Sequence, residues 1–395
     1  MRSEDATDQP PRVVYWNNIP APYMVERFNA LADRATVDLE VWFSERTVPD
    51  RSWRIDESEW RFRHRYLPQV SVGGGRVGLA TQLLRRRGPE LLVMQYGALE
   101  YVVAWAAAVL RGWRTAFWVE VTFDSSVRRR PYREWLKRRM FSRVDGVLTA
   151  GEDGAAFARR YGASDERIHI VRHVVDAGYY SSRGSDHDSG REALRQSLGI
   201  EGTCFLYVGR LWELKGIFEL TAAYARMRSA GVSAALVIVG DGRDEGRLRA
   251  DIASRELDGI TFAGFVQRED LPRWYAAADV LVFPTRGDTY GMVVDEAMAA
   301  GLPVISTTAA GEIGTRVVEG ETGWLVPARD PEGLAQAMAS AVRDPAAVSR
   351  MGRTASKRML GLGPGRWADE FEDAVSGILG PPRPHRGARL RHPSA

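Results

Sequence analysis

The chain has 395 residues, of which 45% are hydrophobic and 27% charged, so it is long enough for two or three domains with large cores. A single cysteine excludes a disulfide framework, and no apolar run reaches the roughly 18 residues of a membrane-spanning helix. Four arginines within residues 381–395 account for the formal charge of +3, so the sequence does not predict a nucleic-acid surface over the fold.

The first half of the chain alternates apolar strands with helical segments. Residues 1–11 are polar and acidic, so we expect them to be disordered; with no apolar stretch they do not form a secretory signal, and a cytoplasmic location is expected. Strands that alternate with helices are typical of a parallel sheet covered on both faces, which predicts an α/β, Rossmann-like domain over residues 12–180. Short apolar runs predict its buried strands at residues 12–16, 37–43, 91–94, 116–121 and 146–149.

A second domain of the same class is predicted after a polar interruption. Residues 181–191 contain no apolar side chain, which indicates a linker over residues 181–198. Residues 199–362 then predict another doubly wound parallel sheet, and the basic residues 381–395 a disordered tail. Because open parallel sheets bind ligands at the carboxyl ends of their strands, we expect a functional cleft between the domains. The strands of the second sheet are predicted at residues 205–208, 234–239, 260–262, 280–283 and 303–306.

Two cations follow the first predicted strand of the second domain. Arg210 comes directly after Gly209, and Lys215 follows five residues later, just before a predicted helix that starts near Gly216. A guanidinium fork, an ammonium group and a helix N-terminus together suit a diphosphate. The alternative is a surface ion pair between Arg210 and Glu213, and the residues alone leave both interpretations open.

Two carboxylates stand eight residues apart around the start of another predicted helix. Asp288 precedes the turn at Gly291, and Glu296 lies in the first turns of the helix that begins near Met292. The two side chains can point into one pocket, and the first amides of the helix can hold an anion. The alternatives are that Asp288 caps the helix and that Glu296 lies on its solvated face.

The segment of residues 128–143 is strongly basic, with eight cations and one acid. Tyr132, Trp135, Leu136 and Met140 recur in it at helical spacing. Such a helix can lie on an anionic membrane or against an anionic acceptor. We favour the alternative, in which its aromatic face packs on the first sheet and its cations are solvated.

Residues 203–345 resemble family 4 of the glycosyltransferases, the retaining enzymes with the GT-B fold. The first half is similar only in general layout: residues 171–176 look like the family's segment that crosses between the domains, with His173 where Asn is usual. As in the family, the helix at residues 363–380 is expected to cross back to the first domain. The matching segments are residues 208–216, 239–242, 262–265, 274–279, 291–305 and 323–327, together with Pro284 and Asp330.

The resemblance implies a nucleotide-diphosphate hexose as donor, with UDP or GDP as the nucleotide. Arg210 and Lys215 would bind the diphosphate, and Glu296 would bind the ribose hydroxyls. Asp288 stands where the family has glutamate, so its side chain is one methylene shorter. The implied donor-binding set is completed by Gly209, Gly240, Val266, Gln267, Tyr290, Gly291, Met292 and Val293.

The resemblance also implies that the first domain binds the acceptor. Glu120 and Asp124 would orient the acceptor hydroxyl, or they are solvated loop residues. Catalysis would be electrostatic and would depend on Arg210, Lys215, Asp288 and Glu120. No metal or other cofactor is expected, because the two cations do what Mg²⁺ does elsewhere. The candidate acceptor contacts, all at predicted strand ends facing the cleft, are Asn17, Asn18, Tyr23, Tyr96 and Asp124.

The sequence alone is compatible with three functions. The first is a hexosyltransferase that acts, as a monomer or homodimer, on a hydroxyl of a glycan, a glycolipid or a natural-product aglycone. The second is a sugar-nucleotide 2-epimerase on the same fold, and the third is a non-catalytic subunit that binds the nucleotide sugar. The cytoplasm is the expected location, with peripheral contact at the inner face of an anionic membrane as an option.

Overall fold

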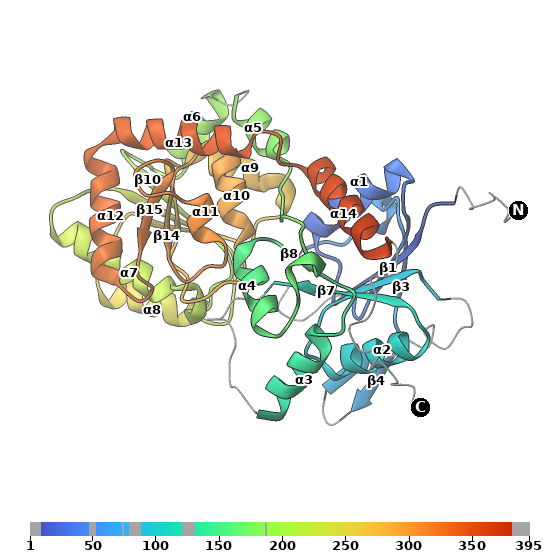
Figure 1. Cartoon of the computed structure of the whole chain (residues 1–395). Helices are drawn as coiled ribbons and strands as arrows, with labels where there is room; N and C mark the ends of the chain where they lie inside the picture. The colour runs from blue at the N-terminus through green and yellow to red at the C-terminus, as the bar shows by residue number, and fades with distance from the viewer. Residues whose placement is uncertain are drawn as a thin grey trace, which may run out of the picture.

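The computed structural model describes residues 9–46, 53–72, 75–78, 88–120, 131–185 and 188–380. This part of the chain folds into two α/β domains, each with a parallel sheet, that lie side by side (Figure 1). The two-domain class predicted from the sequence is therefore confirmed. The predictions for residues 1–8, for Asp124 and for residues 381–395 concern residues outside this description.

Among the described residues, the main sheet of the first domain has seven parallel strands in the order β3-β2-β1-β6-β7-β8-β9. Its central strands are nearly continuous apolar runs because helices cover both faces of the sheet. A separate antiparallel hairpin is formed by β4 (Gln69–Val72) and β5 (Gly75–Gly78). The strands of the main sheet are β1 (Arg12–Asn17), β2 (Asp38–Phe43), β3 (Arg63–Tyr66), β6 (Leu91–Met94), β7 (Arg114–Val119), β8 (Gly146–Thr149) and β9 (Ile168–Ile170).

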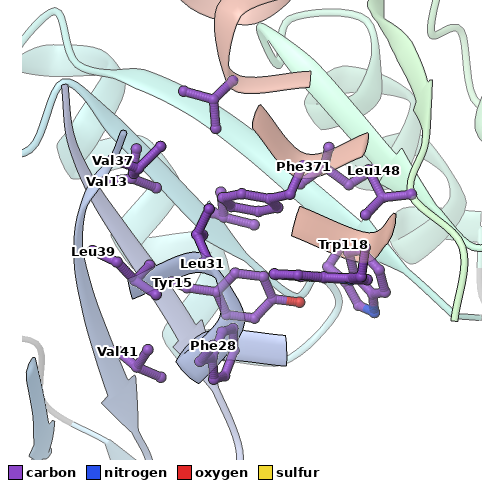
Figure 2. Packing of buried hydrophobic residues seen from close by; sticks show 14 of the residues in the cluster. Val13, Tyr15, Phe28, Leu31, Val37, Leu39, Val41, Trp118, Leu148 and Phe371 are labelled. Carbon is purple, nitrogen blue, oxygen red and sulfur yellow. The ribbon is translucent and has the colours of Figure 1, made fainter. Parts of the chain in front are cut away.

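The two faces of the first sheet have separate cores. On one face, Phe28 of α1 (Pro22–Arg34) packs in one cluster with Tyr15 of β1 and Trp118 of β7, as Figure 2 shows. Phe371 of α14 (Pro364–Leu379) completes this core, and α14 lies beside α1 although it follows the second domain in the chain (Figure 1). The other face is covered by α2 (Leu99–Leu110), α3 (Pro131–Phe141) and α4 (Glu152–Arg160), and the 3-10 turns η1 (Glu57–Glu59) and η3 (Asp165–Arg167) lie in connections.

The described part of the second domain has a six-stranded parallel sheet in the order β12-β11-β10-β13-β14-β15. Its strands are β10 (Cys204–Val208), β11 (Ala235–Val239), β12 (Ile260–Gly264), β13 (Val280–Phe283), β14 (Val304–Thr307) and β15 (Gly323–Val326). One face carries α7 (Ile217–Ser229), α8 (Glu245–Ser254) and α12 (Pro331–Arg343), and the other carries α9 (Leu271–Ala277), α10 (Met292–Ala299) and α13 (Pro345–Met359). Shorter elements are η4 (Glu213–Lys215), η5 (Arg268–Asp270) and α11 (Ile313–Arg316).

The linker expected at residues 181–198 is instead largely helical. The structure has α5 (Ala177–Ser185) and α6 (Asp188–Ser197) there, and both helices pack on α9. Arg191 and Arg195 of α6 pair with Asp279 at 2.6 and 3.1 Å, and Leu194 and Leu198 pack on the core of the second domain, so this largely polar segment is held in place. The crossing between the domains lies earlier, because Val174 is in the first core and Val175 is in the second.

None of the helices described has both the length and the hydropathy that crossing a bilayer requires.

Candidate functional site

A cavity of about 530 Å³ lies where the carboxyl ends of the first sheet face the second domain. Loops after β1, β6 and β7 provide its polar wall, and Arg210 reaches it from the second domain. The structure brings Glu120 and every described candidate acceptor residue into this cavity. Arg210, which is expected to bind the donor diphosphate, lies there with them. These residues are Asn17, Asn18, Tyr23, Tyr96, Glu120 and Arg210.

Arg210 is presented by a tight turn after β10. Gly240, at the end of β11, has φ +132°, and a Cβ there would lie 2.0 Å from the carbonyl oxygen of Gly209. Only glycine permits this approach of the two strand ends. The Arg210 guanidinium stacks on the Trp212 ring at 3.6 Å, whereas Glu213, its alternative partner, pairs with Arg286 at 2.6 Å.

Lys215 and Asp288 form an ion pair, with side chains that are only 16% and 15% exposed. The other carboxylate oxygen of Asp288 accepts from the backbone N–H of Tyr290 at 3.1 Å. The N-cap of α10 is Gly291, at φ +81°, so Asp288 does not cap this helix. Lys215, which is expected to bind the diphosphate, and Asp288 thus lie together beside the α10 N-terminus.

Glu296 is partly buried and hydrogen-bonded, so it does not lie on a fully solvated helix face. Its Oε2 accepts a hydrogen bond of 2.6 Å from the Tyr275 hydroxyl. Burial raises the pKa of Glu296, and this rise is partly opposed by the Tyr275 hydrogen bond and by the charge of Arg268. Arg268 in turn pairs with Glu26 of α1, so this end of the site also contacts the first domain.

The loop before α10 is held by Arg316, which sequence reasoning missed. This buried guanidinium pairs with Asp295 at 3.1 Å and donates to the carbonyls of Gly291, Gly311 and Tyr290. It also lies 3.9 Å over the Tyr290 ring. The backbone that would face a phosphate is therefore fixed by one cation from α11.

A buried chain of three polar side chains leads from α1 to the cavity. Arg27, which is fully buried, donates to Nδ1 of His173 at 2.6 Å, and Nε2 of His173 lies 3.2 Å from Glu120. Burial, and then the charge of Arg27, lower the pKa of His173, so the ring is neutral with its proton on Nε2. Burial alone would raise the pKa of Glu120, but the hydrogen bonds from His173 and Trp118 outweigh it and lower the pKa. Glu120 is thus an ionised carboxylate at neutral pH.

The donor-side residues also contact the first domain. The Tyr290 hydroxyl donates to the carbonyl of His173 at 3.3 Å, and Arg27 lies 3.6 Å from the sulfur of Met292. Gln267 accepts from the backbone N–H of Arg54 at 3.3 Å, and Val266 packs on the core of the second domain. The loop after β13 and the start of α10 are therefore shared by both sides of the cleft.

Glu312 joins the domains at a second point, which no sequence motif indicates. Its carboxylate accepts from the backbone N–H groups of Asp153 and Gly154 at 2.7 and 3.4 Å, at the start of α4. In return, the Asp153 carboxylate accepts from the backbone N–H of Glu312 at 2.7 Å. A Cβ on Gly151 would lie 2.4 Å from this carboxylate, so the close contact requires glycine there. We call this reciprocal pair of contacts the Glu312–Asp153 latch.

No cluster of three or more His, Cys, Asp or Glu side chains suited to a metal ion occurs within the described ranges.

The chain is similar in sequence to known glycosyltransferases over part of its length. The family "Glycosyl transferases group 1" matches residues 202–344, which confirms the resemblance predicted for the second domain. D-inositol 3-phosphate glycosyltransferase of Pseudarthrobacter chlorophenolicus is 31% identical over 236 residues, covering 57% of this chain and 54% of that protein. Glycogen synthase of Mycobacterium tuberculosis is 29% identical over 226 residues, covering 57% and 51%. The chain thus spans about half the length of the curated relatives that it matches.

The likeness to solved structures extends over both domains. The Anabaena protein HepE in complex with UDP superposes with a TM-score of 0.76 at 16% identity, covering 92% of this chain and 99% of that one. Sucrose-phosphate synthase from Thermosynechococcus elongatus gives 0.73 at 20% identity, covering 93% and 99%. The fold is therefore GT-B, as the sequence predicted.

Proposed function

We propose that the protein is a glycosyltransferase that moves a hexosyl group from a UDP-sugar to a hydroxyl of an acceptor in the interdomain cavity. The observation that carries the proposal is the position of Arg210 in the same cavity as the polar strand ends of the first domain. The names of the relatives support the reaction class, and the complexes of HepE with UDP and with UDP-glucose support the donor class.

The donor diphosphate would bind between Arg210, Lys215 and the start of α10. Lys215 would move part of its interaction from Asp288 to a phosphate oxygen, and Asp288 would then face the sugar. The first backbone N–H groups of α10, at Met292 and Val293, add donors of the kind that anions select. Glu296 would accept from the ribose hydroxyls, with Gln267 and Val266 near the base.

The chemistry in this proposal is electrostatic. As the bond between the sugar and the diphosphate breaks, negative charge grows on the leaving phosphate and positive charge on the sugar ring. Arg210 and Lys215 stabilise the leaving group, so no metal ion is needed for that task. Reaction on one face of the sugar, with retained configuration, is the stereochemistry that the family resemblance implies.

Glu120 would orient the acceptor hydroxyl. One of its oxygens accepts from both Trp118 and His173, which fixes the carboxylate at the cavity wall. A fixed, ionised carboxylate can accept a hydrogen bond from a hydroxyl and hold it toward the sugar. His173 and Arg27 act through Glu120 and are positioning residues.

A thermal-shift panel of UDP- and GDP-sugars tests the donor, because a ligand that binds only the folded state raises the melting temperature. We expect a UDP-hexose to raise it, and EDTA to leave both the shift and the transfer rate unchanged. Absence of a shift with every nucleotide sugar would contradict the proposal.

The two other functions have distinct outcomes. Epimerisation of the donor incubated alone, seen by NMR, would favour the 2-epimerase. Binding of the donor, with neither transfer to any acceptor nor slow hydrolysis of the donor, would favour the non-catalytic subunit.

A further inference from the structure

Helix α2 is unusual for a helix at the protein surface. Its sequence carries a single charged residue, Glu100, and its inner side packs into the core through residues that include Tyr101 and Trp105. Its outer side is apolar as well, since Leu99, Val103 and Leu110 are 61%, 60% and 86% exposed. Spacings of four and seven residues place these three side chains in one stripe along the helix. An exposed face of a surface helix is normally polar, so this stripe indicates a contact with something apolar.

Helix α3 lies over the same face of the sheet as α2 and adds aromatic and cationic side chains. Met140 packs into the core that the two helices share, but Tyr132 and Trp135 are 58% and 66% exposed. The expectation that the aromatic face of this segment packs on the sheet is therefore wrong for these two residues. Exposed arginines accompany them on the same helix: Arg133, Arg138 and Arg139.

We propose that this α2–α3 face, defined by Leu99, Val103, Leu110, Tyr132, Trp135, Arg133, Arg138 and Arg139, docks on an anionic lipid surface. Apolar side chains enter the boundary of the acyl chains, while tryptophan and tyrosine prefer the headgroup region. Arginine adds attraction to anionic headgroups. The acid of α3 does not oppose this attraction, because Glu134 is bonded to Lys137 and to the Tyr161 hydroxyl.

The α2–α3 face adjoins the interdomain cavity. Ala98, Glu100 and Tyr101, at the start of α2, line that cavity, and Leu99 is exposed between them. Lys137 of α3 lines a neighbouring cavity together with Tyr96 and Glu120. A bilayer on this face therefore lies beside the proposed acceptor site. If the proposed transferase function holds, the acceptor is a hydroxyl on a membrane-anchored molecule.

Co-sedimentation with vesicles tests the docking without any donor or acceptor. We expect the full chain to sediment with phosphatidylcholine vesicles that contain about 30% phosphatidylglycerol, but not with pure phosphatidylcholine, and raised salt to weaken binding. Arg138→Glu with Arg139→Glu, and Val103→Asn with Leu110→Asn, should each reduce binding about tenfold or more.

Matched control variants lie on the second domain. Arg350→Glu with Arg353→Glu repeats the charge change on exposed positions of α13, and Leu360→Asn repeats the apolar change at a side chain that is 73% exposed. Both controls should bind vesicles like the wild type.

Three results would overturn the docking proposal. The first is that the wild type does not sediment with anionic vesicles. The second is that the control variants lose as much vesicle binding as the α2–α3 variants. The third is that analytical ultracentrifugation shows a homodimer, which the α2–α3 variants dissociate. A melting-temperature shift with a UDP-sugar is scored separately, so failure of the docking proposal leaves the transferase proposal standing, and the reverse also holds.

Discussion

The two walls of the cleft are built in different ways. In the second domain, the candidate ligands of the diphosphate and the ribose come from two short segments, residues 209–216 and 288–296, and glycines impose the turns that present them. In the first domain, the cavity wall collects single residues from loops that are far apart in the chain, such as Asn17, Tyr96 and Glu120. A diphosphate is common to many donors, whereas acceptors differ. The comparison indicates that a compact motif suits the shared ligand and separate loops suit the variable one.

Removing the cation that fixes the donor loop should have the largest effect on stability. Arg316→Leu leaves Asp295 buried without its partner, so the free energy of unfolding should fall by about 3–5 kcal/mol. Urea denaturation measures this change. The double variant Arg316→Leu/Asp295→Leu should recover part of the loss, and an equal or larger loss in the double variant would contradict the ion-pair explanation.

Removing a side chain that is expected to bind the diphosphate should slow the reaction without unfolding the protein. Arg210→Ala should lower the transfer rate about 10²-fold or more, with little change in melting temperature. Arg243→Ala is the matched control, because Arg243 also lies over the Trp212 ring, at 4.7 Å, but is not part of the cavity wall. Similar rates in the two variants would show that Arg210 does not serve the leaving group.

Opening the Glu312–Asp153 latch tests whether the two walls are held together. Glu312→Ala removes the acceptor of two backbone N–H groups, which should disfavour the closed arrangement by about 1–3 kcal/mol. Small-angle scattering should then give a larger radius of gyration. Glu319→Ala, which removes a similar contact within the second domain, to the N–H of Leu325 at 2.8 Å, should leave the radius unchanged. A radius that Glu312→Ala does not change would show that the latch does not hold the domains.

The buried histidine should give the smallest effect, visible as a pH dependence. The pKa of His173 is lowered in the folded protein, so only the unfolded chain takes up a proton as the pH falls below 6.5. The wild type should lose up to about 1.4 kcal/mol of stability per pH unit below that value, relative to His173→Asn. Parallel pH profiles of the two proteins in chemical denaturation would show that His173 is not held neutral.

Site residues in compact local motifs could be predicted from the sequence, whereas residues that depend on distant contacts could not. Arg210, Lys215 and Asp288 were found because they lie near glycines at strand ends, where backbone geometry is encoded locally. Arg316 could not be found in this way, because its partners on the donor loop and α10 (Tyr290, Gly291 and Asp295) lie more than twenty residues away. One arginine among many also carries no distinguishing pattern.

Two further features could not be predicted from the sequence. The exposed outer stripe of α2 is one, because a helix with apolar residues on all sides is normally buried. The helices in residues 181–198 are the other, because the composition predicts a linker and does not reveal that Arg191 and Arg195 converge on Asp279. For residues 181–198 the deciding contact therefore lies outside the segment itself.

The role of the two cations is best examined in a crystal structure with UDP-glucose bound. We expect the Arg210 guanidinium and the Lys215 ammonium both to contact phosphate oxygens, and the anomeric carbon to face the cavity wall at Glu120. A bound nucleotide whose phosphates contact neither cation would contradict this expectation.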